Sequence, residues 1–324
     1  MELPLAFDAQ LFIQLTINGV TLGSLYALIA LGYSLVYGIL KLLNFAHGDV
    51  YMVGAFIGYG VLTALGGPLS LDIALVPLIV LMFLAAMLGS GALGVLIERF
   101  AYRPLRDAPR LAPLISALGV SFFLQNSALL LLGAGFRSYD SFLLGSDHPE
   151  LFLPGPLVDP VFVIHGVNVQ TIQLVVLSVT VGLMVALTLF VARTQLGKAM
   201  RATAFDREAA AMMGIDVDRV IASTFFIGSV LAGAAGVMFG LLFSQVFHLM
   251  GFLAGLKGFT AAVVGGIGSI PGAMLGGLLV GLAEAYAAGY VGGRWSDLFV
   301  FGILILVLLV RPSGLLGARA INKV

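Results

Sequence analysis

The sequence predicts an all-α, polytopic membrane protein with about eight to ten transmembrane helices. The first observation is composition: 60% of the 324 residues are hydrophobic and only 10% are charged. Soluble domains are about half apolar and about a quarter charged. The second is that apolar runs of about 20 residues follow one another along the chain and leave no room for a soluble domain. We therefore expect residues 1–324 to form a single transmembrane domain.

Composition also excludes several classes of function. The formal net charge is zero, so the chain lacks the positive charge by which proteins bind nucleic acid. Cysteine is absent, which excludes disulfides and thiol chemistry. No G-x-x-x-x-G-K-[ST] loop occurs, so we expect no nucleotide to bind to this chain. No His, Cys or carboxylate residues stand at the spacing of metal ligands, and we expect no metal site.

Each predicted helix rests on one apolar segment. Long segments lie at 10–40, 50–66, 71–97, 111–133, 171–193, 220–244 and 296–310. The first of these either crosses once or is a broken or doubled element, because it is 30 residues long. The Gly-rich stretch 253–291 predicts two further short helices. They are broken at Gly265–Gly272, as a hairpin or re-entrant pair.

Basic residues predict the orientation of the helices. Most of the 16 Lys and Arg residues lie in 99–110, 193–219 and 311–323. The positive-inside rule places these three regions in the cytoplasm. The loop 134–170, which contains many Pro, Gly and Asp residues, is then extracytoplasmic. The N-terminus is also outside if 10–40 crosses once.

The loop 193–219 concentrates charge in an otherwise apolar chain. Asp206 is a candidate N-cap for a short helix that Gly214 would end. We expect Ala210 and Met213 on its exposed face. The pattern E-A-A-A-M-M-G is typical of a loop that docks on a motor ATPase, and the candidate coupling residues are Arg207, Glu208, Ala209, Ala210 and Gly214. The alternative is an ordinary solvated loop.

Polar residues between two apolar runs form a first candidate for a substrate pathway. Asn44, His47 and Asp49 occur in K-L-L-N-F-A-H-G-D. Ionisable groups at membrane depth are costly and usually functional. The alternative places them at the membrane interface, where Asp49 would favour the N-terminal end of the helix 50–66.

Two more pathway candidates lie in the Gly-rich stretch. Ser269 is a candidate N-cap, with Pro271 in the following first turn, and a helix N-terminus at membrane depth suits a passing carboxylate. Close glycine packing is the alternative. Glu284 stands in an apolar stretch and must face protein or water. It lines the pathway or pairs with Lys257 or Arg294.

The chain resembles the permeases of branched-chain amino acid ABC importers, and most closely the H-type membrane subunit of the leucine/isoleucine/valine system. The resemblance runs nearly end to end. It is carried by N18-G-V-T-L-G-S-L-Y-A-L-I-A-L-G32, L43-N-F-A-H-G-D49, I97-E-R-F-A-Y-R-P-L-R106, L111-A-P-L-I-S-A-L-G119, G197-K-A-M-R-A202, G258-F-T-A-A-V-V-G-G-I-G-S-I-P-G-A273 and R311-P-S-G-L-L-G317.

This resemblance implies a multi-pass subunit of the bacterial cytoplasmic (inner) membrane that does no covalent chemistry. Its implied partners are a second, M-type permease subunit, two cytoplasmic ATPase subunits that hold ATP and Mg, and an extracytoplasmic amino-acid-binding protein. Relatives that carry urea or short amides differ little in these motifs, so such a substrate is an alternative. Two further alternatives are a secondary transporter in which Asp49, Glu284 and His47 relay protons, and a purely structural membrane scaffold, which leaves the coupling loop unexplained.

Overall fold

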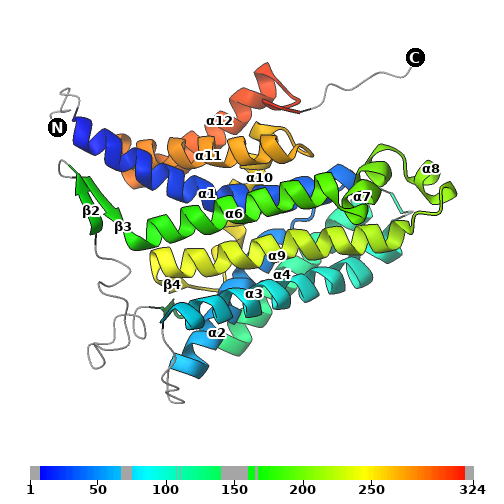
Figure 1. Ribbon diagram of the computed structural model, residues 1–324, viewed down its shortest axis with the longest axis horizontal. Coiled ribbons are helices and arrows are strands. Elements are labelled where there is room, and N and C mark those ends of the chain that lie inside the picture. Colours follow the sequence, from blue (N-terminus) through cyan, green and yellow to red (C-terminus); the bar gives the residue numbers. More distant parts are fainter. Residues whose placement is uncertain are drawn as a thin grey trace.

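The computed structural model describes residues 8–66, 75–106, 108–109, 111–139, 160–164 and 167–317. Figure 1 shows a bundle of long helices with two small pairs of strands. The long helices are α1 (Ala9–Leu40), α2 (His47–Gly66), α3 (Leu75–Ile97), α4 (Leu111–Leu132), α6 (Thr171–Arg193), α9 (Val217–Phe243), α10 (Met250–Gly265), α11 (Ile270–Ala287) and α12 (Ser296–Val310). The shorter helical elements are η1 (Glu98–Tyr102), η2 (Arg103–Leu105), α7 (Gln195–Phe205), α8 (Arg207–Met212), η4 (Ala288–Gly292) and η5 (Gly293–Trp295). The strands are β1 (Arg137–Ser138), β2 (Pro160–Ile164), β3 (Val167–Gln170) and β4 (Gln245–Val246).

The predicted apolar segments are confirmed as helices. Seven helical stretches of the described residues are long and apolar enough to cross a membrane, and one of them contains both α11 and α12. The helix α10 is a shorter apolar one. The nine long helices named above therefore agree with the predicted range. The segment 10–40 is one continuous helix, α1, and not a broken or doubled element.

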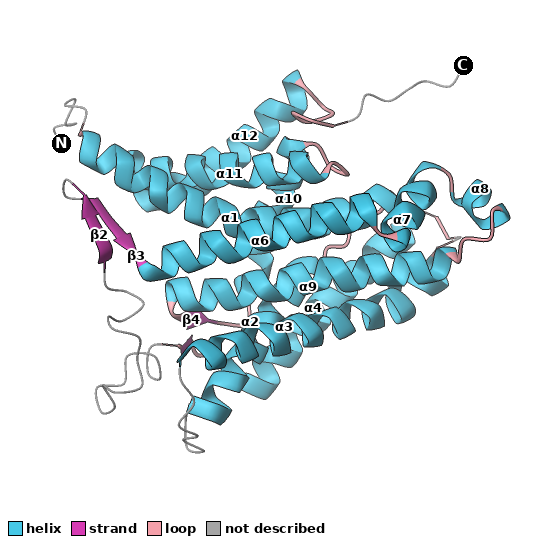
Figure 2. Cartoon of the chain, in the orientation of Figure 1, coloured by secondary structure: helices cyan, strands magenta, loops and turns pink. Residues whose placement is uncertain are grey.

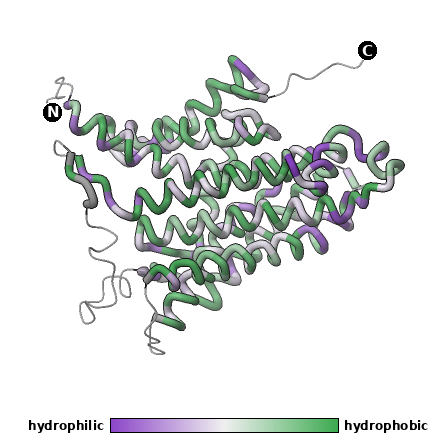
Figure 3. Tube along the Cα trace, viewed as in Figure 1, coloured by the Kyte–Doolittle hydropathy of each residue, from purple (hydrophilic) through white to green (hydrophobic). Residues whose placement is uncertain are grey.

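The bundle has two chemically different ends. The basic end is made of 98–106, 193–219 and 311–317, and the hydrophilic residues of α7, α8 and the adjoining helix ends gather on the right of Figure 3. Arg103 joins the two sides of this end by an ion pair to Asp218, 2.8 Å long, and Arg106 bonds to both Asp218 and the buried Glu98. The basic regions 98–106 and 193–219 are therefore brought together at this end.

The opposite end, called the sheet end, carries the strands drawn in magenta in Figure 2. Here β1 pairs with β4 and β2 pairs with β3, both antiparallel. Tyr139 donates a hydrogen bond to the Ala55 carbonyl, 2.6 Å, which fixes β1 on α2. The start of α1 is held by Gln14, which bonds to the backbone of Asn168. In the predicted loop 134–170, residues 140–159 and 165–166 lie outside the described residues.

Helix α1 lies at the centre of the bundle. Every residue from Gly23 to Val36 is buried, which fits a helix that has no polar face. It crosses α11 at very close range, because small residues recur every fourth position on both helices. A Cβ at Gly23 would lie 2.8 Å from the Leu278 Cα, and one at Gly281 would overlap the Gly23 backbone. Glycine is therefore required on both sides of this crossing.

The predicted broken hairpin of 253–291 is confirmed as α10 and α11, with its break beside residues 311–317. The turn between them has Gly266 at φ 111° and Gly268 at φ 90°, and Ser269 caps α11 as predicted. The turn sits at the basic end, where Leu315 and Leu316 donate backbone hydrogen bonds of 2.9 and 2.8 Å to the last turn of α10. The chain itself therefore satisfies carbonyls that the break leaves free.

Candidate functional site

The charged loop at the basic end folds as two short helices, α7 and α8, of which α8 is the predicted helix between Asp206 and Gly214. The Asp206 carboxylate accepts hydrogen bonds of 3.0 Å from the backbone N–H groups of Glu208 and Ala209, and so starts α8. Gly214 ends it at φ 82°, a left-handed conformation that disfavours other residues. The loop is thus a folded unit at the tip of the bundle, where α8 is drawn in Figure 1.

The exposed face of this unit differs from the expected one. Ala210 is buried against the structure below it, so its prediction as an exposed residue is wrong. The helix is short and the chain folds back at Gly214, which turns Ala210 inward: its carbonyl accepts from the Ile215 N–H, 3.1 Å. The side chains that project are Phe205, Met212 and Met213, which are 88%, 82% and 83% exposed. Large apolar side chains presented outside the bundle are typical of a protein contact.

Arg207 connects α8 to the core of the bundle. Its guanidinium donates a hydrogen bond to the Ile39 carbonyl in the last turn of α1. The two residues lie on the wall of a cavity of about 600 Å³ between α1, η2 and α7. Partial burial, together with the guanidinium of Arg106, lowers the pKa of Arg207 from its usual value. This hydrogen bond links α8, which contains the coupling candidates, to the transmembrane helix α1.

The three candidates Asn44, His47 and Asp49 are buried inside the bundle, not placed at its surface. His47 packs against Gly32, which lies about 12 Å along α1 from its end. The segment 41–46 therefore turns back into the bundle, and α2 begins inside the bundle rather than at its end. Asp49 accepts a hydrogen bond from Gln125 of α4, 3.0 Å, and lines a small cavity of about 30 Å³. Asn44, His47 and Asp49 are not arranged as metal ligands, and Asp49 and Glu284 line different cavities.

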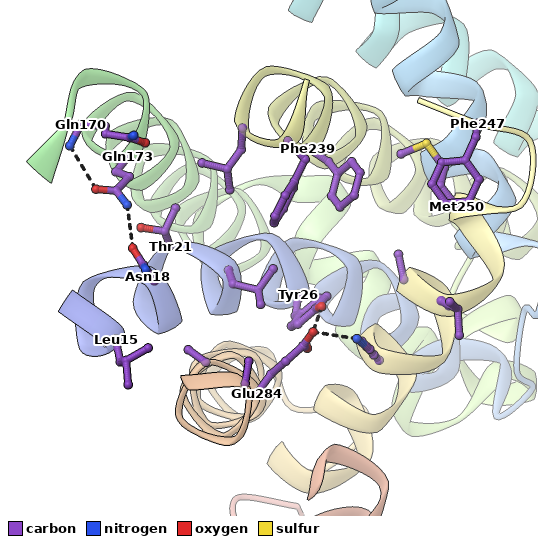
Figure 4. A pocket seen from close by; sticks show the side chains of 18 residues that line it. Leu15, Asn18, Thr21, Tyr26, Gln170, Gln173, Phe239, Phe247, Met250 and Glu284 are labelled. Atoms are coloured by element: carbon purple, nitrogen blue, oxygen red, sulfur yellow. Dashed lines mark hydrogen bonds and ion pairs between the residues drawn. The ribbon is translucent and has the colours of Figure 1, made fainter. Parts of the chain in front are cut away.

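A cavity of about 540 Å³ opens between α1, α6, α9, α10 and α11 (Figure 4). Its size is typical of sites for small molecules. One wall is apolar and consists of Phe239, Leu242, Phe243, Phe247 and Met250. The other wall is polar. Glu284 and Tyr26 lie beside each other on it, and Asn18 and Gln173 lie nearer the sheet end.

The charged residues of this cavity form one network. Lys257 of α10 bonds to Glu284 of α11, 2.7 Å, as one of the sequence alternatives predicted, and forms a second ion pair of 2.7 Å with Asp297 of α12. Tyr26 of α1 donates to the other Glu284 oxygen, 2.8 Å. Gln173 donates to Asn18, 3.0 Å. Four helices are thus tied together around one ammonium group.

The predicted pathway residues are therefore not one site. Glu284 lines the large cavity, Asp49 lines the small one, and Ser269 stays at the basic end, about 22 Å along α11 from Glu284. Sequence reasoning missed Tyr26, Asn18, Gln173 and Asp297, because no local pattern shows which distant residues each of them meets. Within the described residues, no group of three or more His, Cys, Asp or Glu side chains is arranged to hold a metal.

Long apolar helices around an interior cavity with one polar wall are typical of a multi-pass membrane transport protein. Residues 15–308 match the family described as "branched-chain amino acid transport system / permease component". The chain belongs to this family of ABC transporter permeases, and it is a transport component of such a complex and not an enzyme. The expected resemblance is confirmed.

Individual relatives agree over nearly the whole chain. The permease protein BraD of the high-affinity branched-chain amino acid transport system of Pseudomonas aeruginosa is 46% identical over 97% of this chain and 98% of its own length. The corresponding LivH protein of Escherichia coli K12 is 44% identical over 97% and 98%. A probable LivH of Methanocaldococcus jannaschii is 28% identical over 91% and 89%. No solved structure matches the chain.

Proposed function

We propose that this chain is the H-type permease of an ATP-driven importer that carries branched-chain amino acids into a bacterial cell. The single observation that carries the substrate assignment is the large cavity. It sets an apolar wall of Phe239, Leu242 and Phe243 opposite the charged pair Lys257 and Glu284. A branched-chain amino acid has both characters, a hydrocarbon side chain and a zwitterionic end, whereas urea and short amides lack the first.

The chain lies in the cytoplasmic (inner) membrane as one transmembrane domain, residues 1–324, with its basic end in the cytoplasm. The positive-inside rule supports this orientation, because Arg103, Arg106, Arg193, Arg207 and Arg219 lie at one end of the bundle. The sheet end, with residues 134–170, then faces the extracytoplasmic side. The cavity lies nearer to this end, where a substrate would be delivered by a binding protein.

The partners follow from this arrangement. A second, M-type permease subunit would complete the membrane part, and two cytoplasmic ATPase subunits would hold ATP and Mg. The loop 193–219 would dock on one ATPase through the exposed Phe205, Met212 and Met213. The coupling candidates would hold these exposed side chains in place, because they form the start, the end and the anchor of α8. They are Arg207, Glu208, Ala209, Ala210 and Gly214.

The substrate path would run through the cavity beside Glu284. Asn44, His47 and Asp49 are held in the interior where α2 starts, and they would respond to movements of α1 and α4 rather than touch a substrate in this state. Ser269 would serve as the cap of α11. A proton relay through Asp49, His47 and Glu284 is not favoured, because Glu284 lines the large cavity and Asp49 lines the separate small one.

The test is uptake by the reconstituted complex. The tagged chain is purified from its native membranes, together with the permease, ATPase and binding-protein subunits encoded beside it, and placed in proteoliposomes. We expect uptake of labelled leucine that requires ATP and is inhibited by isoleucine and valine but not by urea or acetamide. Uptake that prefers urea or acetamide, or that follows an imposed proton gradient without ATP, would contradict the proposal.

A further inference from the structure

The ion-pair network in the cavity has an unused hydrogen-bond donor. The Lys257 ammonium carries three N–H donors, and among the described residues it bonds to one oxygen of Glu284 and one of Asp297. The side chains of Lys257 and Glu284 are nearly buried, 11% and 14% exposed, but both line the cavity. Two opposite charges are thus held side by side at the edge of a space that a small molecule can enter.

We propose that Lys257 and Glu284 are the binding site for the charged end of an amino acid zwitterion inside the permease. The inference rests on the proposed function and specifies where in this chain the substrate binds. The substrate carboxylate accepts a hydrogen bond from Lys257, and its ammonium donates to Glu284. Its side chain then lies toward Phe239 and Leu242 on the apolar wall.

The two signs of charge that line the cavity favour a zwitterion over other ligands. Lys257 and Glu284 are the charged side chains that line the cavity in the described part of the chain. A zwitterion placed across this pair gives each of these two residues a further opposite charge, so that neither is left unpaired when the bond between them lengthens. A neutral amide gives no such compensation, and a simple anion or cation compensates only one of the two residues.

The network is also placed where binding can be transmitted. Lys257, Glu284 and Asp297 come from α10, α11 and α12, and Tyr26 joins them to the central helix α1. A ligand that takes over part of the Lys257 bonding weakens the tie between α10 and its neighbours. A shift in population between conformations requires such differential contacts.

A purely structural role is the competing explanation, and a double substitution separates the two. Replacing a buried ion pair by apolar residues of similar size is often neutral or stabilising. We therefore choose Lys257→Met/Glu284→Met, measured in the whole transporter. Arg103→Met/Asp218→Met, which removes an ion pair at the basic end, is the matched control. The readouts are the Tm of the complex, equilibrium dialysis of labelled leucine against the complex without its binding protein, and ATP-dependent uptake.

We expect Lys257→Met/Glu284→Met to keep the Tm within a few degrees and to weaken leucine binding about tenfold or more, because it removes hydrogen bonds to charged groups. Uptake should fall, while the control pair keeps wild-type leucine binding. If the double variant does not fold, Glu284→Gln replaces it: this variant should weaken the binding of leucine but not that of 4-methylpentanoate, which lacks the ammonium.

Unchanged leucine affinity in either variant would overturn the inference, as would a wild-type complex that imports leucine but binds none without its binding protein. Both results leave the proposed function standing. Failure of the wild-type complex to import leucine at all would instead refute the proposed function.

Discussion

The guanidinium of Arg207 donates a hydrogen bond, 3.1 Å long, to the backbone carbonyl of Ile39, 168 residues earlier in the chain. It joins the first residue of α8 to the last turn of α1. Because a helix end has free carbonyl groups, an arginine side chain is a suitable partner for it. A movement of α8 is therefore passed directly to the helix at the centre of the bundle.

We predict that Arg207→Met uncouples the transporter. A hydrogen bond from a charged donor contributes about 1.5–3 kcal/mol, and partial exposure reduces this. Uptake of leucine per ATP hydrolysed should fall about three- to tenfold, with ATP hydrolysis itself retained. The control is Lys198→Met, which removes an exposed positive charge from α7. Equal losses in both variants would mean that charge, and not the link to Ile39, matters.

The turn after α8 depends on glycine. Gly214 has a φ of 82° and open space around it, so a larger side chain is opposed by backbone strain rather than by a clash. We expect Gly214→Leu to cost about 1–2 kcal/mol locally and to impair coupling, with normal amounts of folded permease. Gly214→Asn should restore activity, because asparagine tolerates this conformation. Gly182→Leu, at an open position inside α6, should have no effect.

Orientation can be tested cleanly, because the chain has no cysteine. Val163→Cys at the sheet end and Met213→Cys at the basic end both introduce a thiol at an exposed position. In intact cells an impermeant maleimide should label the first variant only. After permeabilisation of cells that lack the ATPase subunits, which would otherwise cover Met213, it should label both. Labelling of Met213→Cys alone in intact cells would place the basic end outside the cell.

The crossing of α1 and α11 should tolerate no side chain at its glycine positions. A Cβ at Gly281 would overlap the backbone of Gly23, and backbone cannot move aside as a flexible side chain can. We expect Gly281→Val to lower the stability of the purified permease by about 1–3 kcal/mol or more, seen as a lower Tm. Gly302→Val in α12 is the control, since nothing lies within 4 Å of that position. A Tm equal to wild type for Gly281→Val would mean that the two helices are not so close.

The sequence was sufficient for the features that depend on nearby residues. Apolar segments of membrane-crossing length predicted the long helices, and the caps at Asp206 and Ser269 followed from residue types that accept backbone hydrogen bonds. The pairing of Lys257 with Glu284 was one of two alternatives, because an isolated charge in an apolar stretch needs a partner.

Features that depend on distant residues were not predictable in the same way. The break before Ser269 was expected from its glycines, but no local pattern reveals that Leu315 and Leu316 bond to the end of α10 beside it. Tyr26 reaches Glu284 across 258 residues, which no local pattern reveals. Ala210 was expected on the exposed face because its position in a short helix does not show which side the following turn covers.

The central position of α1 has a consequence for how the protein is made. This helix leaves the ribosome first, yet its closest neighbour, α11, is among the last to be synthesised. At about 5–20 residues per second, the interval between Tyr26 and Glu284 is about 13–50 s. During that time the glycine face of α1 has no α11 to pack against. The interior of the permease is completed only when the end of the chain arrives.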